Sequence, residues 1–342
     1  MPLVVQQTKP RVILGLMTFG PSEESGARVT KLEDFNACLD TFQARGYNEV
    51  DTARVYVGRQ QEAFTREAKW KERGLTLATK IEYPAKYGTN TAANVAESAD
   101  ISLKELGGEQ VDFLKDRGVP FAQTLEAIDK LHKAGKFVRF GISNFTAYEV
   151  AEIVMTCKYN NWVRPTVYQA MYNMITRNAE IELFRALRRY GIDIVVYNPI
   201  AGGLFSGKIK SADMVPESGR FSDTANSGAQ YRKRYFRDST FAALQLIETA
   251  AEKHGLSVIE VALRWVVHHS ALKVLDGNDG VIIGVSRKEQ IEENLTHLEK
   301  GPLPADVVEA AEKAWATVKA EATPYWHGEV EYQYDTTKAL FG

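Results

Sequence analysis

Short apolar runs rich in β-branched residues alternate with longer amphipathic segments along the whole chain. The runs that predict strands are residues 11–19, 49–53, 75–81, 111–114, 138–144, 166–173, 193–199 and 281–286. Helical periodicity marks residues 31–44, 60–73, 91–106, 124–134, 147–159, 179–190, 240–254 and 287–298. Strands separated by helices pair in parallel through right-handed crossovers. Eight such units in 342 residues favour an α/β fold of the closed (β/α)8 type, a TIM barrel.

An open, doubly wound sheet is the alternative arrangement of the same units. Nucleotide-binding sheets of that type carry Gly-x-Gly-x-x-Gly after the first strand, and this chain has no such motif there. We therefore expect a single domain over residues 1–342, with the barrel at about 10–320 and a C-terminal tail at 321–342.

Two segments depart from eight plain units. A long insertion, roughly residues 201–238, follows the seventh run and is rich in glycine, serine and basic residues. Loops of this length often form lids or binding loops. The tail carries aromatic side chains without helical periodicity, at Tyr325, Trp326, Tyr332, Tyr334 and Phe341. They could cover a pocket or a subunit interface, or belong to a loosely packed terminus.

Composition narrows the classes of protein. Hydrophobic content of 44%, charged content of 25% and a net charge of −2 are ordinary, and predict no nucleic-acid or membrane partner. No apolar stretch is long enough for a membrane span, and the N-terminus lacks a signal-peptide core. Cys38 and Cys157 lie in predicted helices, so we expect buried reduced thiols and no metal site. The expected location is cytoplasmic.

Polar side chains gather at the ends of the predicted strands. In a parallel barrel the C-terminal strand ends form one face, which holds the active site. The residues at or just past such ends are Asp51, Lys80, Asn144, Gln169, Asn173, Tyr197 and Asn198. This clustering predicts a functional site at that face.

Asp51, Tyr56 and Lys80 suit proton transfer during carbonyl reduction. Hydride addition to a carbonyl leaves an alkoxide that needs a proton, and a free tyrosine has a pKa of about 10. A nearby ammonium lowers that pKa, and a carboxylate can hold the ammonium in place. Alone, Asp51 reads as a strand-end cap, Tyr56 as a packing aromatic and Lys80 as a surface charge. Together, at adjacent strand ends, they favour the catalytic interpretation.

Five segments resemble the aldo-keto reductases, and within them the aflatoxin-aldehyde reductase group. They are Gly15-Leu-Met-Thr-Phe-Gly20, Glu49-Val-Asp-Thr-Ala-Arg-Val-Tyr56, Ala78-Thr-Lys80, Lys136-Phe-Val-Arg-Phe-Gly-Ile-Ser-Asn144 and Tyr197-Asn-Pro-Ile-Ala-Gly-Gly-Leu-Phe-Ser-Gly-Lys208. The resemblance runs from about Val12 into the tail. It implies NADPH-dependent reduction of aldehydes and ketones to alcohols, with Tyr56 as general acid beside Asp51 and Lys80. It also implies a possible homodimer.

The resemblance also implies a histidine at the end of the fourth strand, and this chain lacks it. Val111-Asp-Phe-Leu114 runs directly into Lys115-Asp-Arg-Gly-Val-Pro120, and His132 lies mid-helix on the outside of the barrel. Losing one such donor costs on the order of 2.7–4 kcal/mol of barrier at comparable sites. The alternative function is therefore a weak or inactive NADPH-binding regulatory or scaffold protein. Arg117 could reach the site if the strand shifts its register.

The resemblance assigns the cofactor-binding residues as well. Ser143, Asn144 and Gln169 would hold the nicotinamide amide, with Tyr197 stacked on the ring. The pyrophosphate would lie against Asn198, Gly202, Gly203, Gly207 and Lys208, and the adenosine 2′-phosphate and adenine against Gly284, Ser286, Gln290, Glu293 and Asn294. Met17, Asp51, Leu204 and Arg234 complete the set. The alternatives remain open: Ser143 and Asn144 as a helix cap, residues 284–294 as an ordinary capped helix, and Arg220, Arg232 and Arg234 as solvated loop residues.

Overall fold

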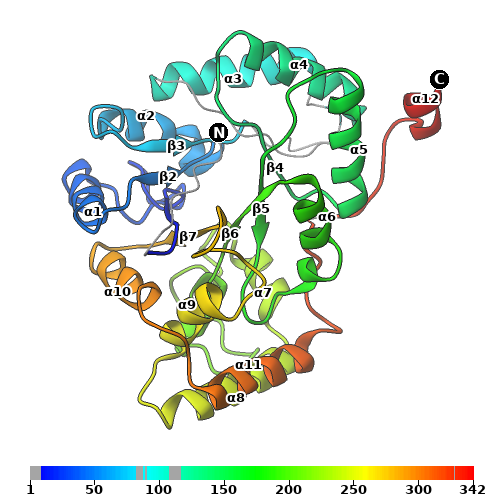
Figure 1. The fold of residues 1–342 in the computed structure, drawn as a ribbon. Helices are drawn as coiled ribbons and strands as arrows, with labels where there is room; N and C mark the ends of the chain where they lie inside the picture. Colours follow the sequence, from blue (N-terminus) through cyan, green and yellow to red (C-terminus); the bar gives the residue numbers. More distant parts are fainter. Residues whose placement is uncertain (1–8, 82–87, 89–90, 108–116, 327) are drawn as a thin grey trace.

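Within the part of the chain that the structure describes, the sheet has seven parallel strands (Figure 1). The computed structural model describes residues 9–81, 88, 91–107, 117–326 and 328–342. The strands are β1 (Val12–Gly15), β2 (Glu49–Asp51), β3 (Thr76–Ala78), β4 (Gly141–Ser143), β5 (Val167–Met171), β6 (Asp193–Tyr197) and β7 (Gly280–Gly284). Each lies inside or at the edge of a predicted run. The fourth predicted run, residues 111–114, lies outside the described residues.

The strand order is β3-β2-β1-β7-β6-β5-β4. The first and last strands of the chain are neighbours, with Val12 opposite Val281 and Gly15 opposite Gly284. From there the order proceeds outward on both sides without doubling back, as it does around a barrel. A doubly wound sheet follows a different order. The described strands thus form a curled part of an α/β barrel whose two edges, β3 and β4, lie before and after the fourth predicted run in the sequence.

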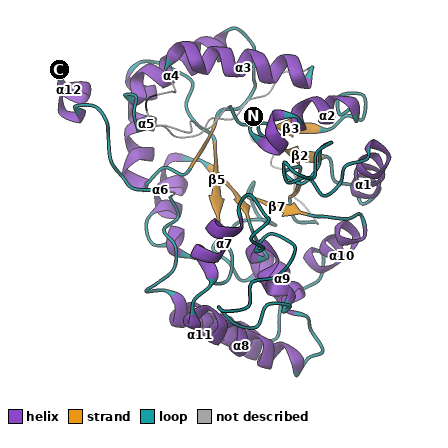
Figure 2. Cartoon of the chain, turned by 180° about the vertical axis from the view of Figure 1, so that it is seen from behind, coloured by secondary structure: helices purple, strands orange, loops and turns teal. Residues whose placement is uncertain are grey.

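Helices surround the strands (Figures 1 and 2). They are α1 (Leu32–Ala44), α2 (Gln61–Glu67), α3 (Ala92–Leu106), α4 (Phe121–Lys133), α5 (Ala147–Tyr159), α6 (Leu183–Tyr190), α7 (Gly228–Tyr235), α8 (Asp238–Glu252), α9 (Val258–His268), α10 (Glu289–Leu298), α11 (Ala305–Val318) and α12 (Thr336–Phe341). Short 3-10 turns are η1 (Tyr56–Arg59), η2 (Asn178–Glu180) and η3 (Ala201–Ser206). The segment predicted as a long insertion contains η3 and α7.

The start of α5 illustrates how local sequence fixes an element. Thr146 and Glu149 form a capping box: the Thr146 side chain accepts from the Glu149 N–H, and the Glu149 carboxylate accepts from the Thr146 N–H at 2.7 Å. The cap is therefore Thr146, and not Ser143 or Asn144 as one alternative had it. Ser143 ends β4, and both it and Asn144 are left to the face of the strand ends.

The apolar core lies mainly between the outer face of the sheet and the helices. A second, smaller cluster consists of Ile13, Val195 and Ile282, with Val167 and Tyr197 packed against it. These side chains alternate along their strands with those of the main core, because successive strand residues point to opposite faces. The small cluster therefore fills the concave, inner side of the sheet. Cys38 and Cys157 are buried free thiols, as expected.

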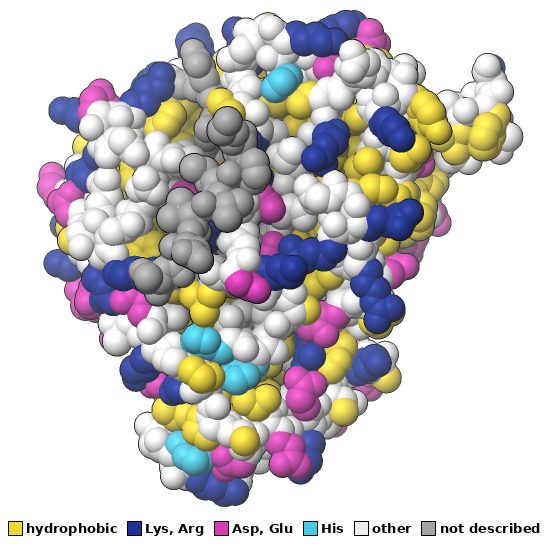
Figure 3. All heavy atoms as spheres, in the orientation of Figure 1, with side chains coloured by type: hydrophobic (Ala, Val, Ile, Leu, Met, Phe, Trp, Pro, Cys, Tyr) yellow, Lys and Arg dark blue, Asp and Glu magenta, His cyan; other side chains and the backbone are white. Residues whose placement is uncertain are grey.

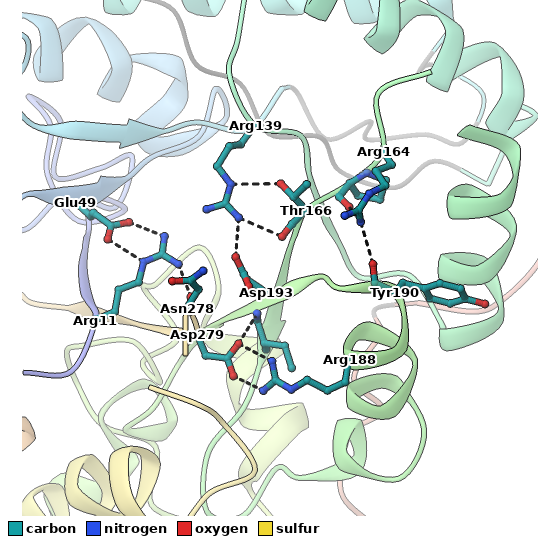
Figure 4. Close-up of polar contacts among 12 residues, drawn as sticks. Arg11, Glu49, Arg139, Arg164, Thr166, Arg188, Tyr190, Asp193, Asn278 and Asp279 are labelled. Atoms are coloured by element: carbon teal, nitrogen blue, oxygen red, sulfur yellow. Dashed lines mark hydrogen bonds and ion pairs between the residues drawn. The ribbon is translucent and has the colours of Figure 1, made fainter. Parts of the chain in front are cut away.

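The N-terminal ends of the strands carry arginine–carboxylate pairs (Figure 4). Arg11 pairs with Glu49, Arg139 with Asp193, and Arg188 with Asp279. Each of the three carboxylates stands at or next to the first residue of a strand. Contacts at the N-terminal face of a parallel barrel contribute to stability, whereas the active site lies at the C-terminal face.

The C-terminal tail has two parts. Tyr325 is buried and its hydroxyl donates to Glu182 at 2.6 Å, while Tyr332 donates to Glu149 at 2.9 Å. Beyond them α12 buries none of its residues, and it projects from the body in Figures 1 and 2. Phe341 is 83% exposed. The loosely packed interpretation thus applies to α12, and not to the segment before it.

None of the described helices has the length and apolar character that crossing a membrane requires.

Candidate active site

Asp51 and Lys80 form a buried ion pair at the C-terminal ends of β2 and β3. Lys80 Nζ lies 2.7 Å from Asp51 Oδ1 and donates to the Thr52 carbonyl oxygen at 2.6 Å. Both residues are 4% exposed, so the interpretation of Lys80 as a surface charge is wrong. The ammonium lies 5.3 Å from the centroid of the Tyr56 ring. The three residues named from the sequence are therefore brought together.

Burial raises the pKa of Tyr56 above its ordinary value. The charge and hydrogen bond of Lys80 act in the opposite direction, but they do not outweigh burial together with the charge of Asp51. The sequence indicates only the lowering effect of the ammonium on this pKa, because the burial of Tyr56 depends on the fold. A phenol with a raised pKa is protonated at neutral pH, which is the state a proton donor requires.

Asn144 offers an unused hydrogen-bond acceptor at this face. Its Oδ1 is buried and has no partner among the residues that the structure describes. Its backbone is left-handed, with φ of 65°, at the end of β4 next to the buried Ser143. A buried amide oxygen without a donor fits a primary carboxamide such as that of a nicotinamide. Gln169, predicted at the same end of the cofactor, donates through its Nε2 to Asp51 Oδ2 at 2.9 Å.

Tyr197 is the last residue of β6, and Asn198 follows it beside α7. Asn198 has a left-handed backbone with φ of 68°, and its Nδ2 donates to the Tyr235 hydroxyl at 2.7 Å. Asn173 donates to the same hydroxyl at 3.1 Å. Burial raises the pKa of Tyr197, and the charge of Arg234 opposes that effect. Helix α7 thus packs against the strand end that carries Tyr197 and is hydrogen-bonded to it through Tyr235.

The glycine-rich segment after β6 turns tightly. Gly202, Gly203 and Gly207 all have positive φ, between 68° and 97°. A Cβ at Gly203 would meet no atom within 4 Å, so its backbone is open to a close neighbour. Leu204 is fully buried and has only its main chain to offer a ligand, whereas Lys208 is exposed.

Arginines of the long segment take different positions. Arg220 lies over the Tyr231 ring at 5.3 Å, and its Nη1 is 3.5 Å from the sulfur of Met17. Arg234 lies over the same ring at 5.2 Å. Arg232, on α7, instead donates to the Phe221 carbonyl and to Asp223 in the loop that precedes this helix. Two of the three arginines therefore face the β1 and β6 ends, and the third braces the loop.

Sequence reasoning missed Tyr231 and Tyr235. Both are buried on α7 and pack against Phe221 in an aromatic cluster. The only sequence signal was their spacing of four residues within an otherwise basic and polar stretch, which places them on one helix face.

The β7–α10 connection is exposed on the same side of the sheet. Gly284 is the last residue of β7, and a Cβ there would meet nothing within 4 Å. The Ser286 N–H and hydroxyl both donate to Gln290 Oε1, at 2.7 and 3.1 Å. Asn294 is 7% exposed and Glu293 is exposed. The residues predicted for the adenosine end thus lie between the last residue of β7 and the second turn of α10.

Arg117 does not reach the strand ends. It is fully buried and forms a two-pronged ion pair with Glu149, at 2.5 and 2.7 Å, and it donates to the Glu329 carbonyl of the tail. His132 lies in the last turn of α4, near the ring of Phe137, and not mid-helix. The shortened fourth run itself lies outside the described residues. Among the described residues no three His, Cys, Asp or Glu side chains gather as a metal site would require.

A barrel with these strand-end residues matches a known family. The family model described as "Aldo/keto reductase family" matches residues 11–316. The chain belongs to this family, which supports an oxidoreductase acting on small carbonyl compounds.

The chain is also similar to individual proteins over most of their length. The chain is 44% identical to an aldo-keto reductase of Pseudocercospora fijiensis, over 84% of this chain and 99% of that protein. It is 37% identical to aldo-keto reductase pigE of Monascus ruber, over 94% and 98%. It is 39% identical to aflatoxin B1 aldehyde reductase member 2 of Homo sapiens, over 93% and 90%. The resemblance drawn from the five segments is confirmed.

Proposed function

We propose that this protein reduces aldehydes and ketones to alcohols with NADPH, and that Tyr56 is the general acid. The observation that carries the proposal is the buried Asp51–Lys80 pair with its ammonium 5.3 Å from the Tyr56 ring centroid. When bound, NADPH supplies the hydride that adds to the carbonyl carbon. The names of the relatives, which include aldehyde reductases, are consistent with this chemistry.

Each residue of the site has a separate task. The Tyr56 hydroxyl donates a hydrogen bond to the substrate carbonyl oxygen and gives up its proton as negative charge develops there. Lys80 stabilises the phenolate that results, because an ammonium this close favours the charged form. Asp51 pairs with Lys80 and keeps the ammonium charged and oriented in its buried position. Reprotonation of Tyr56 completes the cycle.

The cofactor would lie extended across the strand ends. Asn144 and Ser143 would bind the carboxamide, and the open backbones at Gly203 and Gly284 would admit the phosphates. A preference for NADPH over NADH rests on the polar residues around the start of α10, where a helix N-terminus favours an anion. We also propose that residues 111–114 supply the strand between β3 and β4 and close the barrel.

The test is turnover measured beside binding. Binding of NADPH is followed by fluorescence, and its oxidation is measured with an activated aromatic aldehyde such as 4-nitrobenzaldehyde. We expect binding and turnover by the wild type, binding without turnover by Tyr56→Phe, and weaker binding of NADH. Turnover unaffected by Tyr56→Phe would refute the role of this residue.

A second function follows from the missing histidine. A chain without that donor could bind NADPH and regulate or scaffold other proteins while catalysing poorly. Both functions predict NADPH binding, so wild-type turnover separates them. If the wild type binds without turning over, insertion of Tyr-Leu-His-Ala-Pro after Leu114 tests whether the histidine alone restores the reaction.

We further propose that two copies associate through the tail. A helix as short as α12 is unstable in water without tertiary contacts, and Leu340 and Phe341 are exposed on it. The mass in solution of the full chain is compared with that of a chain ending at residue 333. A dimer that becomes a monomer on truncation supports the proposal, and equal masses contradict it.

A further inference from the structure

The turn that follows Tyr56 has an unfavourable backbone conformation. Val57 (φ 48°, ψ 51°), Gly58 (φ 59°, ψ 34°) and Arg59 (φ 69°) are all left-handed. This region suits glycine, and it is uncommon for a β-branched residue such as valine. Strained residues of this kind persist only where the surrounding structure holds them, and they cluster at functional sites. The contacts that hold this turn therefore also decide where Tyr56 lies.

Two contacts hold the turn directly. The Val57 side chain is 4% exposed and fits against Gly20, where a Cβ would come within 2.8 Å of a Val57 methyl group. At the other end of the turn, Arg54 Nη1 donates to the Arg59 carbonyl oxygen at 2.9 Å. Arg54 thus bridges the loop on both sides of Tyr56.

The same arginine is bound to the strand end that carries Lys80. Its backbone N–H donates to the Lys80 carbonyl oxygen at 2.9 Å. Its guanidinium lies 3.5 Å from Glu62, whose side chain has no exposed surface. The other carboxylate oxygen of Glu62 accepts from Thr79, the residue before Lys80, at 2.6 Å. A continuous path of polar contacts therefore joins the Tyr56 turn to the Lys80 strand end through Arg54 and Glu62.

A fully buried carboxylate is costly unless it has a specific partner. Glu62 could be replaced by an apolar side chain if it served packing alone, since burying charges seldom adds stability. Its placement between the guanidinium and the end of β3 instead defines a distance between two segments. Those segments carry the two groups that must act together in proton donation.

We infer that Arg54 and Glu62 are positioning residues that fix the separation between Tyr56 and Lys80. The inference rests on the proposed role of Tyr56 as general acid, and it adds two residues that touch neither the cofactor nor the substrate. We call Arg54 and Glu62 together the bracket. Without the bracket, the left-handed turn would relax and move the phenol of Tyr56 away from the ammonium of Lys80.

The kinetic test uses Arg54→Met, which keeps the aliphatic stem, and Arg66→Met as its control. Arg66 also donates to a main-chain carbonyl, that of Lys104, but it does so at the exposed side of α2. A displacement of about 1 Å can cost about 100-fold in rate. We expect kcat of Arg54→Met to fall by about 10- to 100-fold, with KM and the dissociation constant for NADPH unchanged. The control should behave as wild type.

A second readout does not depend on turnover. The ionisation of Tyr56 is followed by phenolate absorbance, as the difference between each protein and its Tyr56→Phe counterpart. The groups that act on this phenol are Lys80, Asp51 and Tyr231. Distance from the ammonium should move the ionisation of Tyr56 in Arg54→Met to higher pH. If the wild type proved inactive, the proposed function would fail while this titration still tested the bracket.

Glu62→Gln is a second variant that tests the same inference if Arg54→Met does not fold. It keeps the volume and the acceptor for Thr79 but removes the charge opposite Arg54. Arg54→Lys, which keeps a charge that can donate to the Arg59 carbonyl, should recover part of the lost rate. The inference is overturned if Arg54→Met and Glu62→Gln fold, and both match the wild type in kcat and in the titration of Tyr56.

Discussion

Gln169 donates a hydrogen bond to Asp51 across the inner side of the sheet, at 2.9 Å. Gln169 belongs to β5 and Asp51 to β2, and the strands β1, β7 and β6 lie between them in the sheet. Two side chains so far apart along a sheet meet only if the sheet curls on itself. The contact also links a residue expected at the nicotinamide to the carboxylate that holds Lys80.

This contact predicts a double role for Gln169. Replacing it by methionine removes a hydrogen bond to a charged group, worth about 1.5–3 kcal/mol. We expect Gln169→Met to lower kcat/KM by about tenfold or more, with part of the loss in NADPH affinity. Steady-state kinetics and fluorescence binding measure the two parts. Gln245→Met is the control, since Gln245 is exposed and donates to the exposed Thr249 one turn further along α8.

The buried pair at the strand ends predicts a separation of stability from activity. Lys80→Met leaves the buried Asp51 carboxylate without an ion-pair partner, which costs about 3–5 kcal/mol of unfolding free energy. The double variant Asp51→Asn/Lys80→Met has no such charge and should regain much of the stability but none of the activity. Urea unfolding at neutral pH and the rate of NADPH oxidation distinguish the two effects. Equal stability of the single and double variants would contradict the prediction.

The sequence predicted the strands better than the segments between them. Seven runs became strands because β-branched residues mark buried parallel strands in any such fold. Asp51, Lys80, Asn144 and Tyr197 could be named because strand ends follow from the strands themselves.

Periodicity did not predict helix α7 and placed the end of α2 too late, and each difference has a physical reason. Helix α7 is mostly polar and basic, and its two buried tyrosines become meaningful only once β6 is in place. Helix α2 ends at Glu67, earlier than predicted, because Lys69 adopts a left-handed backbone and Trp70 turns in to donate to the Leu106 carbonyl. The partners of Gln169 and Glu62 depend on contacts distant in sequence, which no local pattern specifies.

The Asp279 carboxylate predicts a variant that loses stability alone. Besides Arg188, it accepts from the N–H groups of Ile194 and Lys273, at 2.8 and 2.7 Å, at the end of the barrel opposite the site (Figure 4). Asp279→Asn loses the charge and one acceptor, so thermal unfolding should occur several degrees lower, for a loss of about 1–3 kcal/mol. The kinetic constants should not change. Asp276→Asn, at an exposed position nearby, is the control.

The charged side chains on one face of the molecule are of both signs. In Figure 3 basic and acidic side chains are interspersed over the visible face, and no single sign of charge dominates it. A face on which charges of both signs are interspersed does not produce a strong field of one sign.

Glu149 predicts how stability depends on pH. Burial acts to raise its pKa, but the ion pair with Arg117 and the hydrogen bonds from Thr146 and Tyr332 outweigh burial and hold the pKa below its ordinary value. The unfolded chain therefore binds more protons than the folded one in mildly acidic solution, and stability falls as the pH falls from about 5 toward the folded pKa. Glu149→Gln should flatten this dependence, and at neutral pH it should cost about 3–5 kcal/mol by leaving Arg117 unpaired.

The control for this prediction is Glu152, which lies about one helical turn after Glu149 on α5. Burial raises the pKa of Glu152, and the charge of Glu149 adds to that effect. For a carboxyl group with a raised folded pKa the sign is reversed: the folded state binds more protons, and stability falls as the pH rises through that range. Glu152→Gln should therefore stabilise the protein at neutral pH. Denaturant unfolding of the wild type and both variants at pH values of about 4 and 7 gives the comparison, and equal slopes for all three proteins would refute it.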